Sequence, residues 1–420
     1  MTPVTPVTPT IKQNNKNKNK NKKVAFVSPR YGTEIMGGAE TAVRRLAEHL
    51  SAQTDWEAEV HTTAALDAIT WNDELEPGTS ELNGVTVHRH PTAKGRTMDF
   101  YMLDGLLRLA PRLTTREQGK RWVEYNGPVS PQLVDAVCAS DADVVAFTPY
   151  LYHPTVATIG RVPMPAVFHP AAHDEPALYF SVFRGTFGDA DAFCFYTHSE
   201  RSLVERMYPV AERPQIVLGL GVGDSEGTGR RGDELLGLGD RPYLVSVGRV
   251  DEHKGSKMLA AYFATYKERH PGPLALALVG PISYETEPHP DIVVTGPVDE
   301  ADKWDIVRDS VVAVSASALE SFSLVVIEAW VDRVPVLVNG SCGATREHAE
   351  RSGGGLWFSS YPEFEAVLDR LLGDPALRAR LGDRGRAYVD THFRWPVLVS
   401  RYDTFLNSVV ERGRGTPGLF

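Results

Sequence analysis

The chain has 420 residues, of which 42% are hydrophobic and 23% charged, and its formal net charge at pH 7 is −10. This composition is typical of globular protein, and the length predicts two domains of similar size. An acidic surface repels phosphate backbones and anionic lipid headgroups, which argues against nucleic acid or a membrane as the main partner.

Residues 1–23 differ from the rest of the chain, because they repeat Thr-Pro and then Asn-Lys and hold almost nothing that could pack into a core. They are predicted to form a disordered tail. Removing their six lysines from the net charge of −10 leaves −16 for the remainder. The tail has no apolar stretch or cleavage site of a targeting peptide, and no run of about 18 apolar residues could span a bilayer. We expect a cytoplasmic monomer or homodimer.

From residue 24 onward, short β-branched apolar runs alternate with longer helical patterns, the first of them at 39–52. Several of the runs are apolar on both faces, as a buried parallel sheet requires. The alternation predicts a doubly wound α/β domain over residues 24–220. Its expected strands are 24–28, 57–64, 84–91, 143–149, 165–170 and 192–198.

A glycine-rich, charged stretch without apolar periodicity indicates a linker at residues 221–242. A second α/β series follows over 243–394, and an amphipathic closing helix and tail occupy 395–420. The sequence therefore predicts two Rossmann-like doubly wound domains that face a central cleft. The strands expected in the second domain are 243–248, 274–280, 292–296, 311–317, 334–340 and 354–358.

A glycine pair, Gly37 and Gly38, stands between the first strand and the first helix. Such a pair lets a ligand approach backbone N–H groups at the positive end of the helix dipole. The spacing does not match the GxGxxG of a dinucleotide site, and a tight turn is the alternative interpretation. Glu40, in the first turn of the helix, is either a partner of the helix dipole or a ligand contact.

Two cations follow the first strand of the second domain: Arg249 comes directly after it and Lys254 five residues later. Ligands bind at the carboxyl ends of the strands in open α/β sheets, so both cations would face the cleft. An Arg fork and a Lys point charge suit a diphosphate. The alternative is a solvated turn in which they pair with Asp251 and Glu252.

The stretch ALESFSLVVIEAW places Glu320 just before, and Glu328 within, a helix predicted to begin near Leu324, with Ser321 or Ser323 as its N-cap. Eight helical residues would separate the two Cα atoms by about 12 Å, whereas a retaining glycosidase needs carboxyl oxygens about 5–5.5 Å apart. The glutamates are therefore not an acid/base pair. The helix N-terminus between them suits phosphate and the carboxylates suit hydroxyls; a local cap and a surface glutamate are the alternative.

Three motifs occur in order: GGAE after the first strand, GRVDEHKG at 248–255 and ESFSLVVIE at 320–328. Together they resemble the large retaining glycosyltransferase family 4, of GT-B architecture, over roughly residues 24–412. The resemblance implies a GT-B fold in which residues 24–220 bind the acceptor, residues 243–394 bind the nucleotide-sugar, and the C-terminal helix crosses back to the N-terminal domain. It also implies transfer of a sugar, with retention, from a nucleotide diphosphate-sugar, UDP or GDP, to a hydroxyl acceptor in polysaccharide, glycoconjugate or natural-product biosynthesis, with no metal or other cofactor.

The resemblance assigns roles to the donor-site residues. Arg249 and Lys254 would bind the diphosphate and stabilise the leaving group. Glu328 would hold the ribose hydroxyls, and Glu320 would contact the donor sugar. The further donor contacts would be Gly37, Gly38, the residues Gly296, Pro297 and Val298 near the base, and the N–H groups of Phe322, Ser323, Leu324 and Val325.

On the acceptor side, His173 in HPAAHDEP matches the histidine that such enzymes present to the donor sugar and acceptor, and His169 is the second candidate. Glu40, Tyr150 and Tyr152 are candidate acceptor contacts; for the tyrosines, an aromatic corner of the core is the alternative. The acceptor would be a small molecule or a saccharide.

Two features depart from the family pattern. Many members have glycine where this chain has Ser323, so the sugar-binding loop would be restricted or would gain a hydroxyl contact. Residues 92–105 match no family motif, and acceptor choice lies in such loops. Other classes remain open: a GT-B-fold sugar-nucleotide epimerase or phosphorylase, and a non-catalytic nucleotide-sugar-binding protein. The missing GxGxxG disfavours a dinucleotide oxidoreductase.

Overall fold

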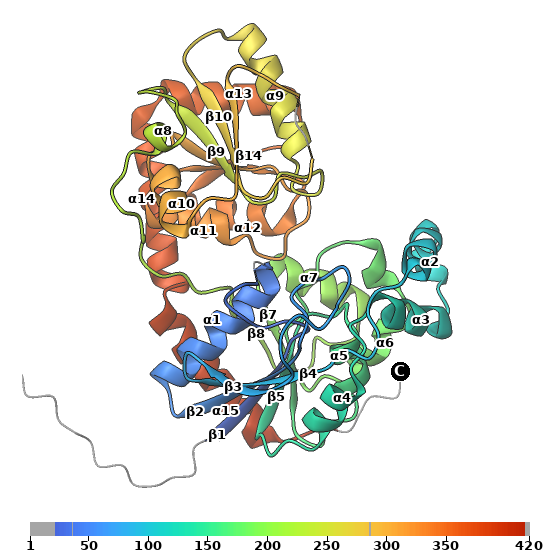
Figure 1. The fold of residues 1–420 in the computed structure, drawn as a ribbon. Coiled ribbons are helices and arrows are strands. Elements are labelled where there is room, and N and C mark those ends of the chain that lie inside the picture. The colour runs from blue at the N-terminus through green and yellow to red at the C-terminus, as the bar shows by residue number, and fades with distance from the viewer. Residues whose placement is uncertain (1–21, 36, 285–286, 416–420) are drawn as a thin grey trace, which may run out of the picture.

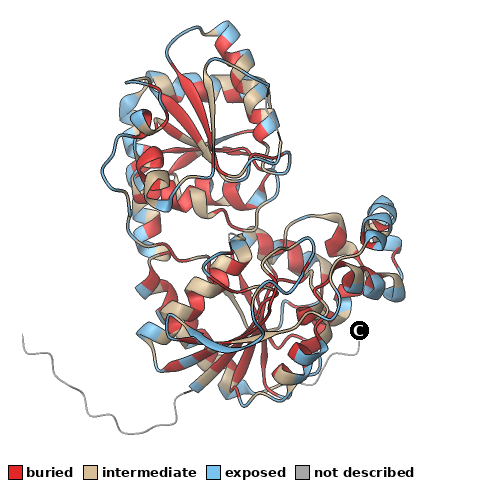
Figure 2. Cartoon of the chain, viewed as in Figure 1, coloured by how far each residue is buried: buried red, intermediate tan, exposed pale blue. Residues whose placement is uncertain are grey.

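The computed structural model describes residues 22–35, 37–284 and 287–415. Most of the expected disordered tail, residues 1–21, lies outside these ranges. Lys22 and Lys23 begin strand β1, so the first sheet starts before the boundary expected at residue 24. The described chain forms two α/β bodies, each built on its own sheet of buried strands (Figures 1 and 2).

The N-terminal sheet has eight strands in the order β3-β4-β2-β1-β5-β6-β7-β8, and β3 is antiparallel to its neighbour β4. All six expected strands are present, whereas β3 and β8 were not predicted. β3 is polar and almost fully exposed, and β8 has only three half-buried residues, so neither carries an apolar signature. The strands are β1 (Lys22–Val27), β2 (Trp56–Thr63), β3 (Gly78–Leu82), β4 (Val85–His90), β5 (Val144–Phe147), β6 (Ala166–Phe168), β7 (Ala192–Phe195) and β8 (Gln215–Val217).

Helices cover both faces of this sheet. Alternate residues of β1 enter two separate cores, Val24 and Phe26 with helix α1 and Ala25 and Val27 with the helices of the other face, which explains why the run is apolar throughout. The helical segments are α1 (Gly38–Gln53), α2 (Met98–Leu109), η1 (Pro111–Leu113), α3 (Arg116–Asn126), α4 (Pro131–Cys138), α5 (His153–Thr158), η2 (Pro176–Tyr179), α6 (Phe183–Gly188) and α7 (His198–Met207).

The C-terminal sheet is parallel, with six strands in the order β11-β10-β9-β12-β13-β14. The chain order reverses between β9 and β12, which is where open α/β sheets bind ligands. Its strands are β9 (Tyr243–Val247), β10 (Ala275–Val279), β11 (Ile292–Gly296), β12 (Val312–Ser315), β13 (Val336–Asn339) and β14 (Gly355–Phe358). Its helices are α8 (Gly232–Leu235), α9 (Ser256–Arg269), α10 (Glu300–Arg308), α11 (Leu324–Val331), α12 (Gly343–Ser352), α13 (Tyr361–Gly373) and α14 (Pro375–His392).

The segment between β8 and β9 is held against the C-terminal body. The buried carboxylate of Asp305 accepts hydrogen bonds from the backbone N–H groups of Thr228, Gly229 and Arg230. Burial alone would raise the pKa of Asp305, but hydrogen bonds from the Thr228 hydroxyl, from the N–H groups of Thr228 and Gly229, and from Arg308 outweigh it and hold the pKa at about 2. The connection is therefore attached to the C-terminal body over these residues.

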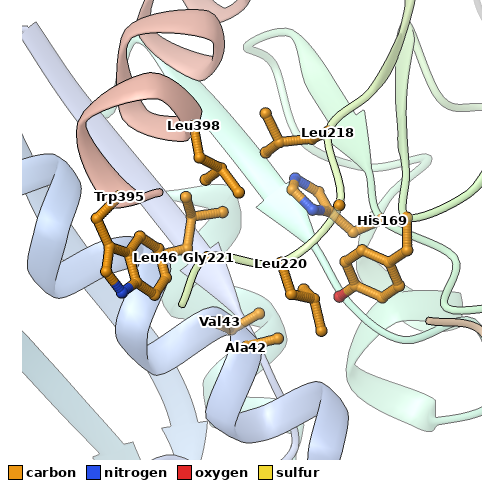
Figure 3. Close-up of a pocket in the computed structure, with 11 residues that line it drawn as sticks. Ala42, Val43, Leu46, His169, Leu218, Leu220, Gly221, Trp395 and Leu398 are labelled. Atoms are coloured by element: carbon orange, nitrogen blue, oxygen red, sulfur yellow. The ribbon is translucent and has the colours of Figure 1, made fainter. Parts of the chain in front are cut away.

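Helix α15 (Trp395–Arg412) returns to the N-terminal body, as expected, and runs beside β1 and β2 (Figure 1). Trp395 stacks on His49 of α1, with ring centroids 4.0 Å apart, and Tyr402 Oη lies 2.9 Å from His169 Nε2. Figure 3 shows the small apolar pocket left at this crossing, lined by Val43, Leu398 and their neighbours. Its apolar lining makes it a packing gap and not a nucleotide site.

The three cysteines are free thiols: Cys194 and Cys342 are buried, and Cys138 is half-buried at the end of α4. Within the part of the chain that the structure describes, no helix has the length and apolar content needed to cross a bilayer.

Candidate active site

Two loops lie side by side at the point where the C-terminal sheet reverses its order. The loop after β9 carries Arg249 and Lys254, and the loop after its neighbour β12 carries Glu320. The β12 loop also contacts the N-terminal body: Thr197 Oγ1 donates to the carbonyl of Ser321 at 3.3 Å, and the ring of Tyr196 packs on Phe322. The candidate donor residues therefore lie where the two bodies meet.

Lys254 and Glu320 form an ion pair, with Lys254 Nζ 2.6 Å from Glu320 Oε1. Gly255, the N-cap of α9, has φ +73°, and a Cβ there would lie 2.4 Å from the carbonyl oxygen of Ala316. Only glycine permits this approach, which brings the β9 loop against the end of β12. The sequence placed both residues at the site, but it did not predict that they pair with each other.

Arg249 is the more exposed of the two cations. Its side chain is 59% exposed, and its Nε lies 3.4 Å from Oδ2 of the buried Asp251. Asp251 also accepts the backbone N–H of Lys254 at 2.7 Å. The salt-bridge turn proposed as an alternative thus forms with Asp251. A guanidinium has five N–H donors, so this contact leaves most of them for a ligand.

Glu328 is buried in α11 and not a surface residue, so that alternative is wrong. Its Oε2 lies 3.1 Å from Nζ of Lys303, which also pairs with Glu300 at 2.6 Å. Burial lowers the pKa of Lys303, but the two carboxylates outweigh it and raise the pKa above its ordinary value. Lys303 was not singled out in the sequence, because a lysine in an acidic helix start carries no signal of its own. Val298 packs against the hydrophobic core to which α10 and α11 contribute.

Ser323 stands at the N-cap of α11, but its side chain does not cap the helix, contrary to expectation. The residue has φ +80° and ψ 84°, and its Oγ is buried without a hydrogen-bond partner. A positive φ favours glycine, which explains the glycine common in the family at this position. The N–H groups of Leu324 and Val325 have no carbonyl one turn earlier in the helix to bond, which leaves them for a ligand.

Ser323→Gly is expected to raise the free energy of unfolding by roughly 0.5–1 kcal/mol, because it relieves the positive-φ strain and removes a hydroxyl that bonds nothing. Urea unfolding of the full chain measures the change. Ser323→Val serves as the opposite case and should lower stability, since a β-branched residue tolerates this φ least. A less stable Ser323→Gly variant would mean that the hydroxyl makes a stabilising contact.

His173 belongs to a polar chain that begins in the core. Tyr150 Oη donates to Glu175 Oε1 at 2.7 Å, and His173 Nδ1 lies 3.2 Å from the same oxygen. Burial lowers the pKa of His173, but contact with Glu175 and the charge of Glu320 in the other body outweigh it and raise the pKa. Tyr150 is fully buried, so the alternative of a core corner is correct and a direct acceptor contact is not.

Glu175→Gln should lower the pKa of His173, since it removes the charge that favours the imidazolium. The imidazole titration, followed by NMR, is expected to have its midpoint above 6.5 in the native protein and lower in the variant. Because the folded pKa is raised, the His173 charge stabilises the fold fully below about pH 6.5 and ceases to do so as pH rises through the folded pKa. Asp174→Asn, which removes a neighbouring carboxylate charge that pairs with Tyr179 and not with His173, is the control. Equal midpoints in all three proteins would contradict the pairing.

Glu200 of α7 fixes the loop that carries His173. Its two carboxylate oxygens accept the backbone N–H groups of Ala172 at 2.8 Å and Tyr196 at 2.6 Å. Complete burial raises its pKa to about 8, against the effect of these donors. His169, the second candidate, is buried against Tyr402 of α15, where it joins the closing helix to the sheet. It does not reach the site.

At the N-terminal glycine pair, Gly37 is the N-cap of α1, and a Cβ there would lie 2.1 Å from Glu40 Oε2, whereas a Cβ at Gly38 would meet open space. Glu40 is buried and paired with Arg30, whose Nη2 lies 2.6 Å from Oε1. The ion pair occupies one oxygen of Glu40. Tyr152 is half-buried, edge-on to Trp71 at 5.2 Å between centroids.

A carboxylate joins the two bodies beside the site. Glu347 of α12 accepts the backbone N–H groups of His198 at 3.0 Å and Ser199 at 2.6 Å, which are the first two residues of α7. A helix N-terminus attracts negative charge, so this contact is favourable without any cation. Together with the Thr197–Ser321 bond, it joins α7 of the N-terminal body to the C-terminal body.

Part of the chain matches a known family. Residues 234–388 match the family model described as glycosyl transferases group 1. The glycosyltransferase 1 domain-containing protein 1 of Xenopus tropicalis is 26% identical over 166 residues, which are 37% of this chain and 47% of the relative. The trehalose synthase of Rubrobacter xylanophilus is 28% identical over 179 residues, 38% of this chain and 42% of the relative. The chain thus spans less than half the length of these curated relatives.

Solved structures resemble the whole described chain. Sucrose-phosphate synthase from Thermosynechococcus elongatus has a TM-score of 0.68 at 17% identity and covers 93% of this chain and 100% of its own. The fold is GT-B. HepE of Anabaena, in complex with UDP and glucose, has a TM-score of 0.62 at 15% identity and covers 92% of this chain and 100% of its own. Within the GT-B fold, the part of the chain that is similar to the group 1 glycosyl transferases lies in the C-terminal body.

Proposed function

We propose that the protein is a retaining glycosyltransferase that transfers a sugar from a nucleoside diphosphate-sugar to a hydroxyl acceptor and needs no metal. One observation carries the proposal. Lys254, paired with Glu320 at 2.6 Å, stands beside the start of α11 at the point where the C-terminal sheet reverses its order. A fixed cation, a hydroxyl-binding carboxylate and backbone N–H groups are thereby assembled in one place.

The donor would be bound by its charges and its hydroxyls. Arg249 and Lys254 would offset the charge that develops on the departing diphosphate, which is electrostatic stabilisation of the leaving group. The N–H groups at the start of α11 add dipoles of the same sign. Glu320 and Glu328 would accept hydrogen bonds from hydroxyls of the donor sugar and the ribose.

Retention would follow from chemistry on one face of the sugar. The bond from the anomeric carbon to the diphosphate breaks, the acceptor oxygen bonds to the same face, and the departing phosphate oxygen takes the acceptor proton. His173, held by Glu175, would donate a hydrogen bond to the donor sugar from the N-terminal body. His173, Glu320, Arg249 and Lys254 are the catalytic residues of this proposal.

The choice of UDP or GDP as donor nucleotide has support from similar proteins. One solved Escherichia coli neighbour of the same fold, at 13% identity, contains UDP-2-fluoro glucose, and HepE contains UDP. A relative from Corynebacterium glutamicum, 31% identical over 90 residues, is named a GDP-mannose-dependent mannosyltransferase; the match covers 21% of this chain and 24% of the relative. Both kinds of donor therefore belong in the test.

A thermal-shift panel of UDP-, GDP-, ADP- and dTDP-sugars tests the donor site. A ligand present at 100 times its Kd stabilises the folded chain by about 2.7 kcal/mol, so at least one sugar nucleotide is expected to raise Tm. No shift with any of them would refute the proposal. A shift without transfer, and without donor hydrolysis that Glu320→Ala abolishes, would point to the non-catalytic binding protein. Interconversion of the donor sugar would point to the epimerase.

The acceptor side has an apolar surface. A pocket of about 600 Å³ lies between η1 and η2, and Glu175 and Tyr179 are among the residues that line it. Next to η1, helix α2 exposes large apolar side chains. Such a patch is unfavourable in water and is typical of a binding surface. The exposed residues of this region are Met98 (76%), Tyr101 (49%), Met102 (69%), Leu106 (60%), Leu109 (82%) and Leu113 (81%). We infer an acceptor with an apolar portion.

This inference predicts that the enzyme prefers an alkyl glycoside over the same sugar without the alkyl chain. Replacing Met102 and Leu106 by serine should lower kcat/KM for the alkylated acceptor about 10-fold, because it removes apolar contact area. The value for the unmodified sugar should not change. Ile282→Ser, an exposed apolar residue of the other body, is the control. Equal loss with both acceptors would contradict an apolar subsite.

A further inference from the structure

A second polar cluster lies within the N-terminal sheet, away from the donor loops. Glu59 and His61 are two residues apart on β2, so both side chains point to the same face. β2 and β4 run parallel with His61 opposite His88, which brings the imidazole of His88 to that face as well. Neither the family motifs nor the proposed reaction uses these residues.

The donor atoms of the cluster converge at metal-ligand spacing. Glu59 Oε1 lies 3.3 Å from His61 Nε2, and Glu59 Oε2 lies 3.8 Å from His88 Nε2. One ligand atom from each residue lies within 4.8 Å of the others. Ligands 2.0–2.1 Å from a tetrahedral zinc ion are about 3.3–3.4 Å apart, a separation that Glu59 Oε1 and His61 Nε2 already have. With one ligand atom from each residue, no separation exceeds 4.8 Å, so the side chains need to move only slightly closer to share one ion.

The second nitrogen of each imidazole has a partner that orients the ring. Thr79 Oγ1 lies 3.0 Å from His88 Nδ1, because β3 pairs with β4 in a register that sets Thr79 opposite His88. His90 Nε2 lies 3.2 Å from His61 Nδ1. Such outer partners fix the tautomer and direction of a ligating histidine, and metal sites in proteins commonly have them.

The carboxylate of Glu59, like the rings of His61 and His88, has a partner that orients it. Ser140 Oγ, in the segment after α4, donates to Glu59 Oε1 at 2.8 Å. The charge of Lys23 acts on Glu59, but the Nζ of Lys23 forms its ion pair with Asp141, at 2.5 Å. The side chains of Glu59 and His61 are only 13% and 6% exposed, so the cluster is a built feature of the sheet and not a chance contact on the surface.

We propose that Glu59, His61 and His88 bind one divalent transition-metal ion, with zinc as the best match, and that the ion joins β2 to β4 near the β3 edge of the sheet. Two imidazoles and one carboxylate are ligands that zinc accepts, and three protein ligands leave a fourth position for water. The site is separate from the donor site, where the proposed reaction needs no metal. Its role is to stabilise the edge of the N-terminal sheet.

Zinc chloride titrated into the full chain, after removal of bound metal with a chelator, tests the site by calorimetry. One equivalent is expected to bind, and binding should raise Tm, because the unfolded chain lacks the preformed site. His88→Gln should lower the affinity about 100-fold or more, and Thr79→Val, which loses only an outer partner, about 10-fold. No binding to the native chain, or unchanged affinity in His88→Gln, would overturn the proposal.

His270→Gln is the matched control. His270 also lies beside a carboxylate, 2.8 Å from Glu365. Among the described residues, however, it belongs to no group of three possible metal ligands. The variant should bind zinc as the native chain does. Cobalt in place of zinc gives a readout that needs no variant. A visible absorption spectrum typical of cobalt bound by oxygen and nitrogen atoms supports the proposed site. A sulfur-to-cobalt charge-transfer band would assign the metal to a cysteine and refute the proposal.

Discussion

Lys254→Ala is expected to lower kcat for sugar transfer by about 10²–10³-fold, the loss seen when one group that stabilises developing charge is removed. The lysine is fixed by Glu320 at 2.6 Å and by the backbone bond of its own N–H to Asp251, so its charge is already in place before the donor binds. A preorganised charge acts mainly on the transition state. The fall should therefore appear in kcat more than in KM.

Lys257→Ala is the control for the loss of positive charge, since Lys257 lies one turn away on α9 and is exposed, over the ring of Tyr284. It should keep at least half of the native kcat. The double variant with Glu320→Gln separates two roles for the ion pair. If Glu320 acts only by holding Lys254, the double variant is no slower than Lys254→Ala; if it also contacts the donor, the losses accumulate. Unchanged kcat in Lys254→Ala would remove the lysine from the mechanism.

The architecture was predictable because it depends on patterns that repeat along the chain. Buried parallel strands leave continuous apolar runs, and these located the six predicted strands of each sheet. The exposed β3 and the three-residue β8 leave no such run, and they were missed for that reason. The crossing of α15 was implied by the family resemblance, and Trp395 on His49 shows the packing that holds it.

The candidate residues could be located on their elements from the sequence, but the contacts among them could not. The motifs placed Lys254 and Glu320 in the loops after two strands and Glu328 within a helix, which is where they lie. Pairing between Lys254 and Glu320, and between Glu328 and Lys303, depends on loops that meet in space after long separations in sequence. The burial of Glu328 was missed as well, because a charged residue gives no apolar signal in the sequence.

The two glutamates that hold the loop carrying His173 were not predicted, because each appears in the sequence as an ordinary acidic residue. Glu175 accepts a hydrogen bond from Tyr150, and Glu200 accepts the backbone N–H groups of Ala172 and Tyr196. The pattern Glu-Val-His followed by His-Arg-His could have indicated the Glu59 cluster, but only the register of β2 with β4 shows that the two motifs share a face.

Trp330→Ala is expected to lower the free energy of unfolding by about 3–5 kcal/mol, the cost of removing a large buried aromatic side chain. Trp330 is fully buried in α11, edge-on to Tyr388 of α14, and its Nε1 donates to the carbonyl of Gly354 at 2.9 Å. The truncation leaves a cavity between the two helices and an acceptor without its partner. Urea unfolding followed by far-UV circular dichroism measures the loss.

Trp330→Phe and Trp357→Ala divide this cost into its causes. The phenylalanine variant keeps most of the packing but loses the bond to Gly354, so it should lose about 1–3 kcal/mol. Trp357 is 36% exposed on β14 and stacks with Arg346, and its removal should cost about 1 kcal/mol or less. Because α11 also carries Glu328 and begins at the donor loop, Trp330→Ala should weaken donor binding as well, whereas Trp357→Ala should not. Equal stability of the two alanine variants would show that α11 is not anchored through Trp330.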